Sequence, residues 1–100
     1  MNEVQFIWDE NKNISNICKH GINFNEAAKV FFDPEHLELY DDKHSTANED
    51  RWIIIGNVNV KILLVIINHK TDNLIRIISA RRATKNEQEA YYEHNSKKFE

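Results

Sequence analysis

Apolar and polar positions in the first third of the chain predict one short strand followed by two helices. Residues 4 to 8 are aromatic and β-branched, as in a short buried strand. Residues 10 to 20 carry apolar side chains at helical spacing, and Gly21 follows where a helix C-cap favours glycine. A second helix begins at Asn23 and stops by Asp33, because proline follows. The positions expected to face the core are Ile14, Ile17 and Cys18 in the first helix, and Phe24, Ala27, Ala28 and Phe31 in the second.

The rest of the chain predicts four strands and a final helix. Residues 36 to 40 alternate like an edge strand, and the polar residues 41 to 50 read as an exposed loop. Thr84 and Glu87 form a capping box that opens the last helix. Three β-branched segments predict an antiparallel meander over residues 51 to 57, 58 to 68 and 73 to 79. The order β-α-α-β-β-β-β-α favours an α+β domain, an antiparallel sheet with two N-terminal helices and a C-terminal helix covering one face.

Length and composition favour one soluble domain that spans residues 1 to 100. One hundred residues with 41% hydrophobic side chains suffice for a single core. No apolar run approaches the roughly 20 residues of a membrane helix, and the N-terminus lacks the features of a signal peptide. We therefore expect a cytoplasmic protein without a membrane partner. The lone cysteine, Cys18, is expected to be a buried thiol.

The charge is unevenly distributed along the chain. The net charge is -3, which by itself argues against a nucleic-acid partner. Residues 1 to 50 hold 4 Lys+Arg and 11 Asp+Glu, a net of -7, whereas residues 51 to 100 hold 9 and 5, a net of +4. The stretch from Arg76 to Lys85 contains four basic residues and no acid. A phosphate-attracting site and a solvated basic strand end both fit this stretch.

Two groups of distinctive residues lie in order along residues 6 to 92. The N-terminal group comprises Trp8-Asp9-Glu10-Asn11-Lys12, Asn16, Lys19-His20-Gly21, Phe24 and Glu26-Ala27. The second group comprises Val30-Phe31, Asp33, Arg51, Ile55-Gly56, the run from Arg76 to Ala83, Glu87 and Tyr91. In their order and intervals, the two groups resemble the BrnT toxin family.

This resemblance implies a RelE-like fold and an endoribonuclease that cleaves RNA to inhibit translation and growth. It also implies a type II toxin-antitoxin system, in which a cognate BrnA-like antitoxin neutralises the toxin and binds operator DNA. The toxin itself would contact that DNA only through the antitoxin. A free toxin of this kind could be a monomer.

Metal-independent RNA cleavage needs a base for the 2′-hydroxyl, cations for the developing phosphorane charge and an acid for the leaving oxygen. Histidine titrates near neutral pH, lysine and arginine hold phosphate, and loop side chains can reach a substrate. The catalytic candidates are Lys19, His20, Arg51, Arg76 and Arg81. The candidates for substrate binding are Arg82, His44 and Glu49.

Structural roles remain open for the same residues. His20 precedes a capping glycine and could bind helix carbonyls, and Arg76 could pair with Asp33 or Glu49 instead of phosphate. No second ligand pair accompanies Cys18 and His20 at zinc-like spacing, so we expect no metal. The absence of a P-loop or dinucleotide fingerprint likewise predicts no cofactor.

Two other classes of function fit parts of the sequence. Residues 9 to 32 could form a helix-turn-helix that binds nucleic acid without catalysis, although the second helix is not basic. Alternatively, the chain is a protein-interaction module that docks through its last helix. The side chains expected to be exposed there are Tyr91, Tyr92 and Phe99.

Overall fold

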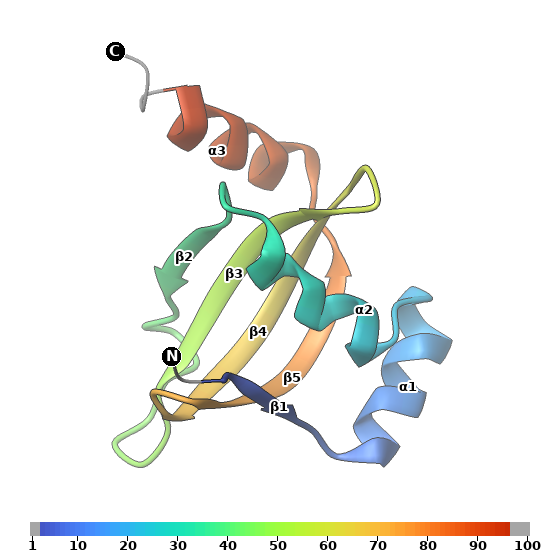
Figure 1. The fold of residues 1–100 in the computed structure, drawn as a ribbon, viewed down its shortest axis with the longest axis vertical. Helices are drawn as coiled ribbons and strands as arrows, with labels where there is room; N and C mark the ends of the chain where they lie inside the picture. The colour runs from blue at the N-terminus through green and yellow to red at the C-terminus, as the bar shows by residue number, and fades with distance from the viewer. Residues whose placement is uncertain (1–2, 97–100) are drawn as a thin grey trace.

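A five-stranded sheet with helices at its face and ends forms the fold (Figure 1). The structure is a computed structural model that describes residues 3–96. Its strands are β1 (Gln5–Ile7), β2 (Leu37–Tyr40), β3 (Arg51–Val58), β4 (Lys61–Thr71) and β5 (Leu74–Arg82). Its helices are α1 (Glu10–His20), α2 (Phe24–Ala28), the 3₁₀ helix η1 (Lys29–Phe32) and α3 (Lys85–Ser96). The predicted order of strands and helices is confirmed.

The sheet is mixed, with strand order β1-β5-β4-β3-β2. Neighbours among β2, β3, β4 and β5 are antiparallel, as their connections predict. β1 pairs in parallel with β5, so the expectation of a purely antiparallel sheet is wrong at this edge. Hairpin connections fix the direction only of strands that follow one another, and most of the chain separates β1 from β5.

Apolar side chains lie on both faces of the sheet. One cluster joins Phe24, Ala27 and Val30 to sheet residues such as Val65 and Ile77, and α2 and η1 cross this face in Figure 1. The cluster on the opposite face consists of Leu37, Ile55, Ile62, Leu64, Ala83 and Tyr91. Because Tyr91 belongs to α3, the expectation that all helices cover one face is wrong for this helix. α3 covers only one end of the second face, and the rest of that face stays open.

Helix α1 buries asparagines and exposes its isoleucines. Asn13 and Asn16 are each 6% exposed, whereas Ile14 is 54% and Ile17 43% exposed. Cys18 is also exposed. The expected inward face of this helix is therefore wrong, although its span is confirmed. The reason is backbone that needs hydrogen-bond partners: Asn16 bonds the free backbone of β5, and Asn13 accepts from the Phe24 N–H at the start of α2.

Local capping signals in the sequence are confirmed. Asp9 accepts a hydrogen bond from the Asn11 backbone N–H, and Gly21 closes α1 in the left-handed conformation. Asn23 caps α2, whose Phe24, Ala27 and Ala28 are buried as expected.

Within residues 3–96, no helix combines the length and apolar character required to cross a membrane.

Candidate active site

A β-bulge in β5 brings three side chains onto the open face. Arg76 pairs with Asn68 and Arg81 pairs with Leu64, but between them the register shifts, since Ile66 pairs with Ser79 and Ile67 with Ile77. Residues five apart on a regular strand point to opposite faces. The extra residue at the bulge restores the alternation, so Arg76, Ser79 and Arg81 all face the same side.

Arg51 faces the same side as Arg76. Both pair with Asn68, Arg51 from β3 and Arg76 from β5, so the three residues form one row across the sheet. With strands about 4.8 Å apart, the α-carbons of the two arginines lie roughly 10 Å apart. The register therefore places both arginines on the same face of the sheet.

A pocket of about 410 Å³ lies on this face, between β5 and the loop that precedes β3. Half-buried Ile53 and Ile66 form part of an apolar floor together with Leu64. The polar and charged side chains that line the pocket are Asp41, Lys43, His44, Arg51, Ser79, Arg81 and Glu87. A pocket with an apolar floor and charged groups of both signs on its rim fits a polar ligand with an apolar part better than a purely apolar one.

Both arginines that line this pocket, Arg51 and Arg81, are paired with carboxylates of the same chain. The Arg51 Nε donates to Glu49 Oε1 at 3.2 Å. The guanidinium of Arg81 donates to both carboxylate oxygens of Glu87, at 2.8 and 2.9 Å. These hydrogen bonds from Arg81 lower the pKa of Glu87 to about 2 and raise that of Arg81. The pairs fix the orientation of both guanidinium groups at the pocket.

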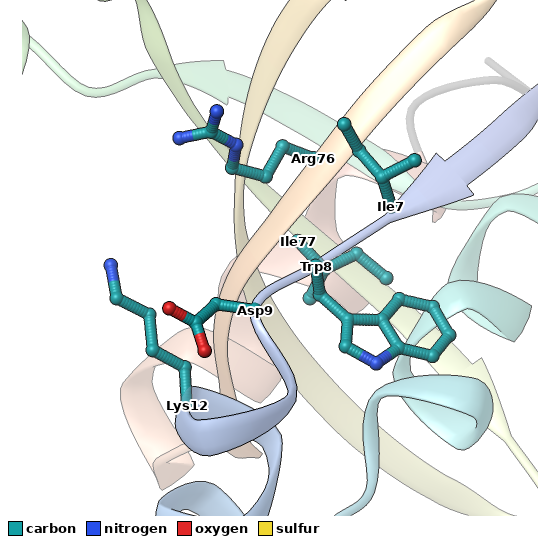
Figure 2. Close-up of a pocket in the computed structure, with 6 residues that line it drawn as sticks. All are labelled: Ile7, Trp8, Asp9, Lys12, Arg76 and Ile77. Atoms are coloured by element: carbon teal, nitrogen blue, oxygen red, sulfur yellow. The ribbon is translucent and has the colours of Figure 1, made fainter.

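Arg76 lies in a neighbouring pocket of about 370 Å³. Figure 2 shows the side chains of Arg76 and Lys12 on one side of the segment that joins β1 to α1, with the Trp8 indole on the other. No residue between 3 and 96 forms a hydrogen bond or ion pair with the Arg76 guanidinium. Asp33 instead accepts from Tyr91, and Glu49 from Arg51, so neither carboxylate pairs with Arg76.

Lys19 and His20 line a third, smaller hollow of about 190 Å³. Lys12 joins this hollow to the pocket of Arg76, and Ser79 joins it to the pocket of Arg51 and Arg81. Among residues 3–96, no hydrogen bond of the His20 ring is found, so its expected contact with helix carbonyls is not observed. The three hollows form one continuous surface along β5 and the adjoining edge of α1.

Arg82 lies away from this surface. Arg82 pairs with Leu63, whose side chain belongs to the cluster on the helix-covered face. The Cα–Cβ bond of Arg82 therefore points to that face, opposite to the pocket. His44 and Glu49 stand beside Arg51, one in the pocket and the other in its ion pair. The predicted residues therefore converge on one surface, apart from Arg82.

The structure also bears on the two other classes of function. α2 has only five residues and packs its Phe24 and Ala27 into the core, which does not support the alternative of a helix-turn-helix. Tyr91 is 5% exposed, which contradicts its expected place on a docking surface, whereas Tyr92 is exposed. Phe99 lies outside the described residues.

Sequence reasoning missed several charged side chains of this surface, among them Lys12, Asp41, Lys43 and Glu87. Glu87 was expected only as a helix cap, and it does cap α3, since its carboxylate accepts from the Thr84 backbone N–H at 2.8 Å. Asp41 stands three residues before His44, and that spacing was the only signal in a polar loop. Within residues 3–96, no three His, Cys, Asp or Glu side chains gather as metal ligands.

Comparison with known proteins gives the class. The family model described as "Ribonuclease toxin, BrnT, of type II toxin-antitoxin system" matches residues 8–87. The 1.1 Å crystal structure of the Brucella abortus ribonuclease toxin BrnT is similar, with a TM-score of 0.60 and 28% identity. The alignment covers 85% of this chain and 100% of the Brucella chain. Among curated proteins, none matches the chain.

The chain is thus a toxin-antitoxin protein of the ribonuclease type. It belongs to the BrnT family.

Proposed function

We propose that this protein is a metal-independent endoribonuclease, which a BrnA-like antitoxin neutralises. The observation that carries the proposal is the convergence of Arg51, Arg76 and Arg81 on one open face of the sheet. Cleavage by the neighbouring 2′-hydroxyl passes through a phosphorane whose extra negative charge such cations stabilise. Protein side chains supply these cations, so this chemistry requires no metal ion.

The cationic side chains along this surface have different roles in the proposed reaction. Arg76 has no partner among residues 3–96, so a phosphate can bind it without displacing an ion pair. Arg51 and Arg81 are already held by carboxylates, which favours a fixed orientation toward the scissile phosphate. Lys19 and His20 lie in the adjoining hollow, where they bind the next phosphates of the RNA.

The test is incubation of purified protein with end-labelled RNA in the presence of a chelator. We expect the wild type to leave 2′,3′-cyclic phosphate ends, and Arg76→Ala to cleave roughly 100-fold more slowly. Arg82→Ala is the matched control, because Arg82 lies on the same strand but its Cα–Cβ bond points to the opposite face of the sheet. An Arg82→Ala defect as large as that of Arg76→Ala argues against this surface.

Two further results bear on the proposed class of activity. Adding a cognate BrnA-like antitoxin should suppress cleavage by the wild type. Failure of the folded wild-type protein to cut RNA, whether free or on ribosomes, contradicts the proposed activity. Cleavage that requires an added divalent cation contradicts its metal independence.

A further inference from the structure

The loop before β3 contains a hydrogen-bonded turn, which the polar sequence of residues 41 to 50 does not predict. The Asp41 carbonyl accepts from the Ser45 backbone N–H at 3.0 Å, which closes one turn. The Asp41 N–H donates to the Arg51 carbonyl at 2.9 Å, and the Arg51 N–H donates to Ser45 Oγ at 2.9 Å. Both ends of the turn are thereby tied to the first residue of β3, whose guanidinium enters the pocket.

This turn places a buried carboxylate against a histidine. The Asp41 side chain is 8% exposed, and its two oxygens lie 3.0 and 3.2 Å from Nδ1 of His44. The His44 side chain is 64% exposed. A carboxylate that accepts from Nδ1–H fixes the tautomer in which Nε2 carries a lone pair. His44 therefore presents a proton acceptor from a side chain whose other nitrogen is held in place.

The pocket beside His44 supplies what a nucleotide requires. Arg51 and Arg81 provide cations for a phosphate, and Ile53 and Ile66 provide an apolar floor. The remaining charged groups that face the histidine's pocket are Asp41, Lys43 and Glu87. In contrast, no carboxylate lines the hollow of His20, so nothing on its walls fixes the tautomer of that ring.

We propose that His44 is the general base of the reaction and that Asp41 is its positioning residue, an inference that rests on the proposed ribonuclease function. Nε2 of His44 takes the proton of the 2′-hydroxyl as the 2′-oxygen bonds to phosphorus. The bond from phosphorus to the 5′-oxygen breaks, and that oxygen takes a proton from water. The products are a 2′,3′-cyclic phosphate and a 5′-hydroxyl, and His44 returns its proton to solvent.

The first experiment compares RNA cleavage by the wild type, His44→Ala, Asp41→Asn and His20→Ala. His36→Gln is the matched control, because His36 also contacts a carboxylate, Glu38 at 2.6 Å, but does not line this pocket. We expect kcat to fall by about 100-fold or more in His44→Ala. Asp41→Asn should lose at least about 10-fold in kcat with little change in KM. His36→Gln should cleave like the wild type.

The second experiment separates a catalytic role from a structural one. Cleavage by the wild type should rise with pH, because a general base accepts a proton only in its deprotonated form. In His44→Ala this rise should disappear, and added imidazole should restore part of the rate. Thermal melts of each variant show whether it folds, and Asp41→Glu should rescue part of the activity if Asp41→Asn fails to fold.

The outcomes distinguish this inference from the proposed function. If the wild type cleaves RNA and His44→Ala retains both the rate and its rise with pH, the contact between Asp41 and His44 only stabilises the loop. The inference is then overturned. The same holds if His20→Ala alone removes the pH rise. If the folded wild type cleaves no RNA, the proposed function fails first.

Discussion

The side-chain amide of Asn16 forms hydrogen bonds with both backbone polar groups of Ala80, 64 residues away in the chain. Its Nδ2 donates to the Ala80 carbonyl at 2.8 Å, and its Oδ1 accepts from the Ala80 N–H at 3.1 Å. Nδ2 also donates to the Ile22 carbonyl at 2.8 Å. β1 pairs only with residues 74 to 76 of β5. At Ala80, beyond the end of this pairing, the Asn16 side chain supplies the hydrogen bonds that a neighbouring strand would otherwise make.

Replacing Asn16 with alanine should therefore destabilise the fold by about 2 to 4 kcal/mol, because three buried backbone groups lose this partner. Urea denaturation measures the loss. Ser15→Ala, an exposed neighbour on the same helix, is the control and should change the unfolding free energy by less than about 0.5 kcal/mol. Equal, small effects of both substitutions would show that α1 is not held through Asn16.

The same contact explains why the sequence misorients α1. Isoleucines and asparagines both recur along residues 10 to 20 at helical spacing, and the hydrophobic rule selects the isoleucines. α1, however, packs beside a strand whose backbone N–H and C=O lack strand partners. Such an edge binds amides, so Asn16 turns inward. Asn13 turns inward for a different reason, because its Oδ1 accepts from the Phe24 backbone N–H at 2.8 Å. Only the tertiary position of the helix reveals this requirement.

Features with local causes were predictable, whereas those set by strand pairing were not. The caps at Asp9 and Gly21 and the three β-branched strands depend on neighbouring residues, and all are confirmed. The bulge in β5 depends on how β4 pairs with it, and no glycine marks it. Because this bulge aligns Arg76 with Arg81, the sequence could nominate both arginines but could not show that they share a face.

The turn between β3 and β4 should tolerate glycine better than its present residue. Asn59 and Val60 have φ values of 51° and 61°, a conformation that asparagine tolerates and a β-branched residue does not. Val60 is 94% exposed, so its side chain gains little from packing. We expect Val60→Gly to raise stability by about 0.5 to 1 kcal/mol in thermal melts. Val60→Ala keeps a Cβ and should gain less; a lower melting temperature for Val60→Gly would contradict the strain.

The hydroxyl of Tyr91 should anchor α3 to the sheet. It donates to Asp33 Oδ2 at 2.6 Å, and that oxygen also accepts from the Asn57 N–H. Burial alone would raise the pKa of Asp33, but the hydrogen bonds from Tyr91 and two backbone N–H groups outweigh it and lower that pKa. Burial and the Asp33 contact both raise the pKa of Tyr91.

Tyr91→Phe removes this charge-assisted hydrogen bond and should cost about 1.5 to 3 kcal/mol of unfolding free energy. Chemical-shift titration of Asp33 should show its pKa rising when the hydroxyl is absent. Tyr92→Phe is the control, since Tyr92 is exposed and its hydroxyl should contribute little. An unchanged Asp33 titration in Tyr91→Phe would contradict the anchor.

The pair formed by Arg81 and Glu87 should make stability depend on pH in the acid range. Hydrogen bonds from Arg81 lower the pKa of folded Glu87 to about 2, compared with 4.5 for an unperturbed glutamate. A carboxylate whose pKa is depressed in the folded state stabilises the fold fully above its unfolded pKa. This contribution is lost as the pH falls from about 4.5 toward 2. Because the Arg81 side chain is 38% exposed, screening by water should limit it to about 1 to 2 kcal/mol.

Urea midpoints measured at several pH values between 7 and 2 should show this loss in the wild type. In Glu87→Gln the protein should be less stable at pH 7, and the fall between pH 4.5 and 2 should be shallower. Glu89→Gln is a matched control, because Glu89 is exposed on the same helix and forms no ion pair with residues 3–96. Since Glu87 also orients Arg81 at the pocket, its substitution should slow RNA cleavage at pH 7, whereas Glu89→Gln should not. Parallel pH curves for Glu87→Gln and the wild type would mean that the Arg81 pair does not stabilise the fold.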